Sequence, residues 1–247
     1  MTEPPSAVLE GAISVRAVLD TNSRTVHAIH LADDRNRAKH ARLLRDARRC
    51  GVPILRATRA ELDALATGRT HGGIVATVGP RRCAPLAVLL RRPAPFLAML
   101  DGVEDPYSLG QSIRALYAAG ADGLLLPARD LTRAAGIVAR ASAGASERMP
   151  TAVVDDPSAA LGTLREHGVR VVCARRRDAA PCDTVDLAGA LLLVIGGQHR
   201  GIGSGVARHV DRWVRVPYGR GFLASLDTTS ATAALSFEIA RQRRACG

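Results

Sequence analysis

From Phe96 onward, short apolar segments alternate with segments of helical character, and this alternation limits the possible folds more than any other feature. Strands that alternate with helices pair in parallel, so we expect a parallel sheet with helices on both faces. The segment 190–195 is apolar without interruption, which indicates a strand buried on both faces. We predict strands at 96–100, 123–126, 151–154, 169–173, 190–195 and 213–216, and helices at 109–119, 132–141, 157–166 and 225–241.

The first 80 residues predict a separate, smaller α/β domain. We expect helices at 12–19 and 36–50, a third helix capped by Thr58 and Glu61, and strands at 25–31, 52–55 and 72–78. Residues 81–95 contain several prolines and two arginine pairs, which is typical of a linker with at most one short helix or turn. The predicted organisation is therefore a small α/β domain over 1–80, a linker over 81–95 and a parallel-sheet domain over 96–247.

The charge of the chain indicates a polyanionic partner. The formal net charge is +11, and Lys39 is the only lysine, so nearly all of the positive charge is arginine. Arginine binds phosphate through two parallel N–H bonds, which favours nucleic acid as the partner. Genomic base composition is an alternative explanation for the choice of arginine, although not for the excess over acidic residues. On the basic helix, Arg42, Arg45 and Arg49 are candidate phosphate contacts, and the alternative is an ordinary solvated helix face.

Several classes of protein are disfavoured. Aromatic residues make up only 3% of the chain, which argues against a binding surface built on aromatic stacking. The five cysteines are scattered without metal-ligand spacing, so we expect free buried thiols and no metal. The longest apolar runs are far shorter than the ~20 residues that span a bilayer, and no secretory signal is recognisable at the N-terminus. We therefore expect a cytoplasmic protein without membrane contact.

Three unusual loops follow predicted strands, at the sheet edge where ligands bind in open parallel sheets. In the first, residues 101–114, we expect Ser108 to cap a helix, Gly110 to allow close backbone approach and Arg114 to lie near the mouth of the loop. The alternative is a capped turn with a surface arginine.

The second loop is rich in glycine, and the third is rich in hydroxyl side chains. The second, residues 194–205, is a glycine cluster that matches neither a dinucleotide nor a phosphate-loop pattern, so its backbone groups either hold a small cofactor or form a mobile surface loop. The third, residues 214–231, places Ser225, Asp227, Thr228 and Thr229 at a helix start, with a well-capped helix as the alternative. The histidines, including His71, His199 and His209, have no recognisable acidic partner and are not expected to be catalytic.

Together, in this order and spacing, the three loops resemble the motifs of the SpoU/TrmH family of RNA 2′-O-ribose methyltransferases, within the SPOUT superfamily. The first 80 residues resemble the substrate-binding domain often attached to this family. The residues that carry the likeness are Asp105, Pro106, Gly110 and Arg114 in the first motif, Gly196, Gly201 and Ile202 in the second, and Pro217, Ser225, Leu226 and Ala231 in the third.

The resemblance implies a catalytic domain with a C-terminal deep trefoil knot, although unthreaded chains are the general rule. It also implies a homodimer with active sites built across the subunit interface, and S-adenosylmethionine bound in the knot. The positions implied for the cofactor are Leu126, Gly196, Gly197, Gln198, Gly201, Ile202, Val216, Pro217 and Leu226, of which Gly196, Val216 and Leu226 would act through backbone groups.

The resemblance assigns Arg114 to the ribose 2′-hydroxyl of a structured rRNA or tRNA. Because a guanidinium stays protonated in proteins, it is a poor base, so Arg114 would orient the hydroxyl and an adjacent phosphate unless its pKa fell. The implied catalytic set is Arg114, Ser108, Ser225 and Asp227, and Arg114 and Arg140 join the arginines of the basic helix as implied RNA contacts.

Four departures from the family pattern fall on the site. Ser108 and Asp227 stand where the family has asparagine, Gly197 replaces asparagine or serine, and Gln198 replaces glutamate. Asp227 adds a negative charge that would repel RNA unless Arg114 or Arg220 neutralises it. Two alternatives therefore stay open: a relative that methylates a small molecule, and an RNA-binding relative with impaired catalysis.

Overall fold

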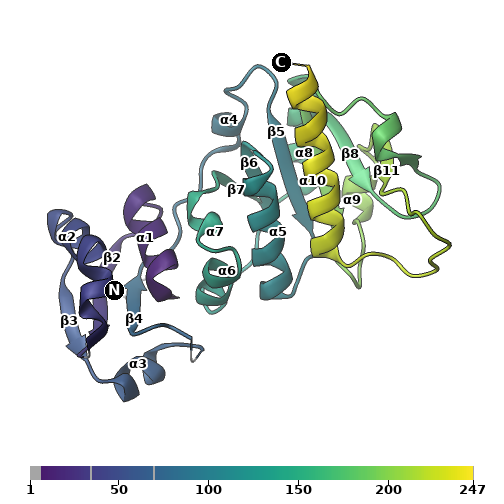
Figure 1. Ribbon diagram of the computed structural model, residues 1–247. Helices are drawn as coiled ribbons and strands as arrows, with labels where there is room; N and C mark the ends of the chain where they lie inside the picture. Colours follow the sequence, from purple (N-terminus) through teal and green to yellow (C-terminus); the bar gives the residue numbers. More distant parts are fainter. Residues whose placement is uncertain (1–6, 34, 69, 247) are drawn as a thin grey trace. The chain divides into compact units, whose positions relative to one another are not determined.

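The computed structural model describes residues 7–33, 35–68 and 70–246, and the chain divides into two compact units (Figure 1). Unit 1 combines Met1–Arg82 with Asp130–Arg148, and unit 2 combines Cys83–Arg129 with Met149–Gly247. The domain predicted for 96–247 is therefore interrupted by a segment that belongs to the N-terminal unit. The boundary near residue 80 lies close to the one predicted.

Unit 1 is built on a four-stranded sheet in the order β1-β4-β2-β3, in which only β2 and β3 pair in parallel. The strands are β1 (Ala7–Glu10), β2 (Val26–Ala32), β3 (Ile54–Ala57) and β4 (Ile74–Val78), and the helices are α1 (Gly11–Thr21), α2 (Ala41–Arg49) and α3 (Arg59–Leu65). Strand β1 was not predicted from the sequence. The helix expected at 36–50 begins as a 3₁₀ helix, η1 (Arg35–His40), and becomes α-helical only at Ala41.

The capping box of α3 is confirmed. The Glu61 backbone N–H donates to Thr58 Oγ1 at 3.2 Å, and the Thr58 backbone N–H donates to Glu61 Oε2 at 2.7 Å. This reciprocal pair satisfies two backbone donors that a helix start otherwise leaves without partners.

Two buried carboxylates hold segment 130–148, with its helices α6 (Ala135–Ala141) and α7 (Ala145–Arg148), to the rest of unit 1. Glu10 pairs with Arg140 and also accepts from the Thr67 backbone N–H at 2.6 Å. Glu147 accepts from Ser23 Oγ at 2.6 Å and from Arg24 Nε at 3.0 Å. A buried charge is tolerated only when it is paired and hydrogen-bonded, and these contacts provide the partners. Ala135 and Ala139 of the segment also pack in the apolar core of unit 1.

Unit 2 contains a seven-stranded, fully parallel sheet in the order β7-β6-β5-β10-β8-β11-β9. Strand β10 (Leu191–Gly196) lies between β5 (Phe96–Asp101) and β8 (Arg170–Ala174), and Leu191–Ile195 are buried as predicted. The other strands are β6 (Gly123–Pro127), β7 (Thr151–Val154), β9 (Ala180–Pro181) and β11 (Arg212–Arg215), with a short 3₁₀ helix, η2 (Cys182–Thr184), after β9.

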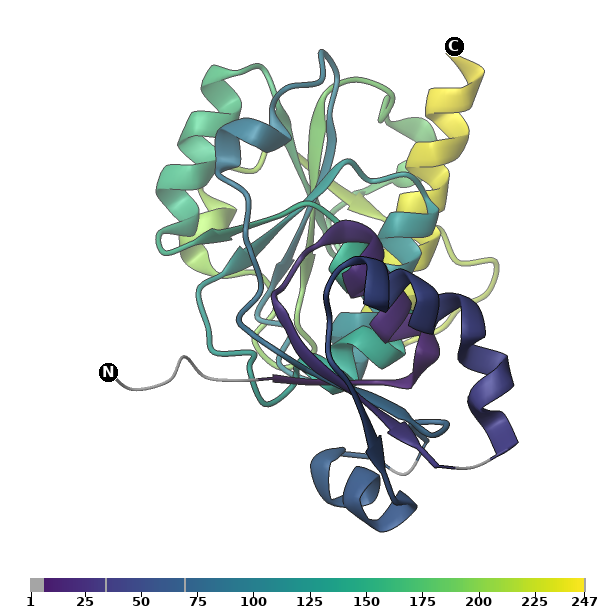
Figure 2. The same cartoon turned by 90° about the vertical axis from the view of Figure 1, so that its left-hand side faces the viewer.

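Helices cover both faces of this sheet, as predicted (Figures 1 and 2). The helices α4 (Leu86–Leu89), α8 (Pro157–Glu166) and α9 (Ser204–Ala207) pack their buried residues on one face, against side chains such as Met99 and Val194. The helices α5 (Pro106–Ala118) and α10 (Thr228–Ala245) lie side by side on the other face. Because Leu89 belongs to the core of unit 2, the expected linker is structurally part of that unit from Cys83 onward.

Candidate active site

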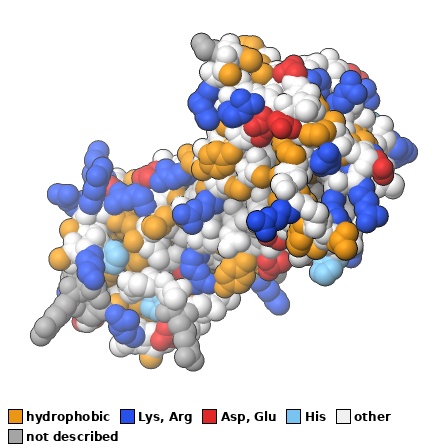
Figure 3. Space-filling view, turned by 45° about the vertical axis from the view of Figure 1, so that its right-hand side comes forward, with side chains coloured by type: hydrophobic (Ala, Val, Ile, Leu, Met, Phe, Trp, Pro, Cys, Tyr) orange, Lys and Arg blue, Asp and Glu red, His pale blue; other side chains and the backbone are white. Residues whose placement is uncertain are grey.

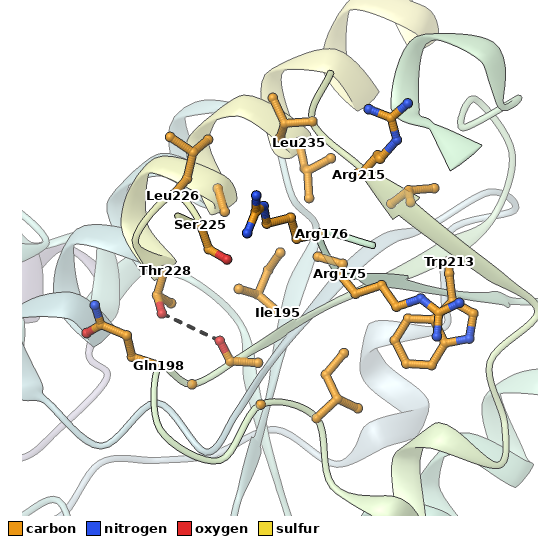
Figure 4. A pocket seen from close by; sticks show the side chains of 18 of the residues that line it. Arg175, Arg176, Ile195, Gln198, Trp213, Arg215, Ser225, Leu226, Thr228 and Leu235 are labelled. Carbon is orange, nitrogen blue, oxygen red and sulfur yellow. Dashed lines mark hydrogen bonds between the residues drawn. The ribbon is translucent and has the colours of Figure 1, made fainter. Parts of the chain in front are cut away.

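A cavity of about 430 Å³ opens at the carboxyl ends of β8, β10 and β11 (Figure 4). Ala174 ends β8, Gly196 ends β10 and Arg215 ends β11, and all three line the cavity. Its volume lies within the roughly 300–1,000 Å³ of small-molecule sites. Its position is the one at which open parallel sheets bind ligands.

The glycine loop after β10 forms one wall of the cavity and is packed tightly against the loop after β5. The Gly197 backbone N–H donates to the Asp101 carbonyl at 2.7 Å, and the Gly203 N–H donates to Asp101 Oδ2 at 2.7 Å. A Cβ placed on Gly197 would lie 1.9 Å from the Gly102 carbonyl oxygen, and one on Gly196 would lie 2.6 Å from the Gly201 carbonyl carbon. Only glycine fits at these two positions, so this wall presents backbone groups to the cavity.

The segment between β11 and α10 forms the opposite wall. Val216, Tyr218, Ser225 and Leu226 line the cavity, and the Leu226 backbone N–H donates to Tyr218 Oη at 3.0 Å. Helix α10 begins at Thr228, three residues later than predicted, which leaves Ser225 and Leu226 in irregular backbone beside the cavity.

Aspartates cap both helices that follow the site loops. Asp227 accepts from the Ser230 backbone N–H at 2.9 Å and from Ser230 Oγ at 2.6 Å, and Asp105 accepts from the Ser108 N–H at 2.8 Å and Oγ at 2.7 Å. In each case the hydrogen bond from the serine hydroxyl lowers the pKa of the aspartate most, and the hydrogen bond from the serine backbone N–H lowers it further. Ser108 is therefore not the cap that the sequence predicted, because it lies inside α5 and donates to the true cap.

Three arginines give the cavity its positive charge. The Arg176 Nη2 atom donates to the Phe222 carbonyl at 2.7 Å, Arg215 Nε to the Ala179 carbonyl at 3.1 Å, and Arg175 lies 4.5 Å over the Trp213 ring. Figure 4 shows the Arg176 guanidinium near Ser225. No aspartate or glutamate occurs among the described residues that line the cavity, so these guanidinium groups are not neutralised there.

Most of the predicted cofactor positions meet at this cavity. Among the described lining residues are Gly196, Gly197, Gln198, Gly201, Ile202, Val216 and Leu226, together with the predicted catalytic Ser225. Leu126, which is buried within β6, and Pro217 are not among them. Ser108, Arg114 and Asp227 are also outside the described lining, and Arg114 lies exposed on α5.

The three arginines were not predicted from the sequence as residues of the site. Arg175 and Arg176 follow the strand predicted at 169–173 after a single alanine, so the rule that placed the glycine loop at the carboxyl edge also applies to them. They were counted only as part of the net charge. Arg215 was hidden inside the strand predicted at 213–216, because a strand position does not show which side chain faces a cavity.

The predicted RNA contacts differ in their surroundings. Arg42, Arg45 and Arg49 are exposed on α2, as a phosphate contact requires. Arg140 instead pairs with the buried Glu10, and its own side chain is only 24% exposed. Its structure-stabilising role is therefore evident, whereas a contact with RNA stays a prediction.

Histidines and cysteines are absent from the described residues that line the cavity. His71 does have an acidic partner, since its Nε2 lies 2.9 Å from Asp63 Oδ1, eight residues earlier in the chain. All five cysteines are free, but only two are buried, and burial raises the pKa of the Cys173 thiol to about 12. Among the described residues, no cluster of potential metal ligands and no helix long and apolar enough to cross a membrane was found.

Comparison with known proteins gives the relationship directly. The model of the SpoU rRNA Methylase family matches residues 95–237, which include every described wall of the cavity. The chain belongs to this family. A second model, RNA 2′-O ribose methyltransferase substrate binding, matches residues 8–83 of the SpoU chain.

Individual relatives match over almost the whole length. The 23S rRNA (guanosine-2′-O-)-methyltransferase RlmB of Pseudomonas putida is 31% identical over 95% of this chain and 96% of its own. The putative TrmH family tRNA/rRNA methyltransferase YacO of Bacillus subtilis is 30% identical over 95% and 96%. The crystal structure of the SpoU methyltransferase AviRb from Streptomyces viridochromogenes in complex with AdoMet has a TM-score of 0.82 at 20% identity, covering 98% of this chain and 92% of AviRb.

Proposed function

We propose that this SpoU protein transfers a methyl group from S-adenosylmethionine to a ribose 2′-hydroxyl of a structured RNA, either rRNA or tRNA. The observation that carries the proposal is the backbone-lined cavity at the carboxyl ends of β8, β10 and β11. Relatives named as RNA 2′-O-methyltransferases match both units, which supports an RNA acceptor.

The cavity fits the cofactor in size and in chemistry. At about 430 Å³ it has room for a nucleoside with a short tail, and Ile202, Leu226 and Leu235 give it apolar walls. The backbone groups of Gly196, which tolerates no Cβ, and of Val216 would hold the adenosine part. The cofactor supplies a methyl group made electrophilic by its sulfonium, so the protein has mainly to align the acceptor with it. AviRb and an rRNA methyltransferase from Sinorhizobium meliloti have been solved with AdoMet, which supports this assignment.

In this proposal Arg114 orients the acceptor hydroxyl across a homodimer interface. Arg114 is exposed on α5 and is not among the described residues that line the cavity of its own chain. Tyr117, three residues further along the helix, is 43% exposed, and Phe237 on the neighbouring α10 is 47% exposed. Exposed aromatic side chains on paired helices favour burial against a second copy, which would bring Arg114 to the partner's cavity.

The proposal includes the trefoil knot of the family. Strand β11 lies beyond β8, yet the chain that follows it returns past the carboxyl end of β10, where the Thr228 hydroxyl lies 3.5 Å from the Gly196 carbonyl. Helix α10 then packs beside α5. This return of the chain over its own earlier loop supports a threaded path.

A small-molecule acceptor is a second candidate, favoured by Asp227. Its pKa is lowered by the Ser230 hydrogen bonds, and no ion pair with Arg114 or Arg220 occurs in the described part of the chain. A carboxylate beside the site opposes phosphate, although its charge already interacts with the start of α10.

The test is transfer of labelled methyl groups to total RNA from cells that lack the gene. We expect the label in RNA, and we expect transfer to be lost when the RNA is digested before the reaction. Transfer that survives this digestion with a cell extract as acceptor would support the small-molecule candidate. Binding of S-adenosylmethionine without transfer to either acceptor would contradict both.

A further inference from the structure

The segment between β11 and α10 exposes apolar side chains at the edge of the cavity. Phe222 is 53% exposed and Leu223 is 85% exposed, whereas Tyr218, Ser225 and Leu226 of the same segment line the cavity. Exposed apolar side chains at the edge of a cavity mark a place where a ligand or partner can bind.

Phe222 is held in place by contacts on both sides. Its carbonyl accepts from Arg176 Nη2 at 2.7 Å, and its ring centroid lies 6.0 Å from that of Tyr218, with a 53° angle between the rings. The Tyr218 hydroxyl in turn accepts from the Leu226 backbone N–H. The Phe222 backbone and the Phe222 ring thus each contact a residue that lines the cavity, which places the exposed ring at the edge of the cavity.

The charge around this ring is complementary to nucleic acid. Arg175, Arg176 and Arg215 line the cavity, and Arg220 is exposed within the segment itself. None of the four forms an ion pair with a carboxylate among residues 7–33, 35–68 and 70–246. On the face shown in Figure 3, arginine and lysine side chains are spread widely, with fewer acidic ones between them.

An exposed aromatic ring beside unneutralised arginines is the combination with which proteins bind single-stranded nucleic acid. Bases present a flat face that stacks on the ring, and phosphates pair with guanidinium groups.

We propose that Phe222 stacks on an unpaired base of the RNA acceptor while Arg176 and Arg215 bind its phosphates. This assignment rests on the proposed function and deepens it, because it places the unpaired part of the RNA against the segment that closes the cofactor cavity. The low aromatic content of the chain excludes an extended stacking surface, but a single ring at this position is sufficient.

The test measures binding of a labelled oligouridine of about 16 nucleotides, the upper site size of single-strand modules, and of a fully paired RNA of the same length. Phe222→Leu keeps the apolar bulk but removes the π face, so we expect about 5- to 140-fold weaker binding of the single strand. Phe222→Trp is expected to bind within about threefold of the unmodified protein. Ile13→Ala, which changes an exposed apolar side chain on α1, is the control.

Salt dependence tests the phosphate contacts. Arg176→Gln and Arg215→Gln are each expected to lower the slope of log affinity against log salt by about 0.7, the value for one phosphate contact on a single strand. Calorimetric titration of S-adenosylmethionine into each folded variant, without RNA, is expected to give unchanged affinity for Phe222→Leu.

The outcomes separate the two proposals. Unchanged oligouridine binding by Phe222→Leu would overturn the stacking assignment, and so would an equal loss for the paired RNA. A loss of cofactor affinity in Phe222→Leu would show that the ring covers the cofactor instead. Failure of the unmodified protein to bind S-adenosylmethionine would contradict the proposed function, while the RNA-binding measurement would still decide the role of Phe222.

Discussion

Substitution of Gly197 by serine is predicted to damage the cavity, even though serine is a residue that the SpoU motif has at this position. The added Cβ would lie 1.9 Å from the Gly102 carbonyl oxygen, whereas real Cβ atoms essentially never come closer than 3.0 Å. Backbone must therefore move by about 1.1 Å, the difference between these two distances. Two hydrogen bonds fix the glycine loop to Asp101, the residue before Gly102, so this movement cannot stay local.

The expected cost lies at the upper end of overpacking, about 3 kcal/mol. For a domain of roughly 150–250 residues, each kcal/mol lowers the melting temperature by about 2–4 °C, which predicts a decrease of about 6–12 °C. Scanning calorimetry of the Gly197→Ser variant measures this decrease. A parallel titration should show weaker binding of S-adenosylmethionine, because the displaced backbone lines the cavity.

The matched control is Gly162→Ala in α8. A Cβ at Gly162 meets nothing within 4 Å, and alanine is favoured over glycine inside a helix by about 0.5–1 kcal/mol. This variant should melt at the same temperature or slightly higher. If Gly197→Ser melted within about 2 °C of the unmodified protein and bound the cofactor equally well, the tight packing of the two loops would be refuted.

Three further predictions concern other residues of the chain. Arg114→Ala should abolish methyl transfer but keep S-adenosylmethionine affinity within about tenfold, or roughly 1.4 kcal/mol, in calorimetry; a much larger loss would place Arg114 at the cofactor. Glu147→Gln should destabilise unit 1 by about 3–5 kcal/mol in urea unfolding, because it leaves the Arg24 charge buried without its partner; a change below about 1 kcal/mol would contradict the role of this ion pair. The lowered pKa values of Asp105 and Asp227 favour folding above the unfolded carboxyl pKa of about 3.9, and this contribution is lost as the pH falls through the folded values. Melting temperatures measured from pH 7 to 3 should therefore fall below about pH 4, less steeply for Asp227→Asn, and an equal slope in the variant would show that the cap contributes nothing.

Much of unit 2 could be predicted from the sequence because its signals are local. The apolar run of β10 marks a strand buried on both faces, and the glycines that follow mark a wall of backbone. The buried strand is confirmed, and most of the predicted cofactor positions line one cavity, whereas their contact with a cofactor stays a prediction. The prediction of Ser108 as the cap was wrong, because Asp105 and Ser108 are both good capping residues and only their geometry distinguishes them.

The rest depends on contacts between distant residues, which sequence patterns do not show. Arg140 and Glu10 are 130 residues apart, and Glu147 and Ser23 are 124 apart, yet these pairs are among the contacts that join segment 130–148 to unit 1. The role of Arg176 also depends on a partner that is distant in the sequence, because the Phe222 carbonyl is 46 residues away. A run of arginines indicates positive charge, but the direction in which each side chain points is set by hydrogen-bond acceptors elsewhere in the chain.

The most direct measurement of the central claim uses the chemistry of the product. Methylation of a ribose 2′-hydroxyl removes the group that attacks the neighbouring phosphodiester in alkali, so the bond after the modified nucleotide survives hydrolysis. After reaction with methyl-labelled S-adenosylmethionine and RNA, alkaline hydrolysis should release the label in dinucleotides. Label recovered in mononucleotides would mean methylation of a base, and it would contradict the alignment of a ribose hydroxyl with this cavity.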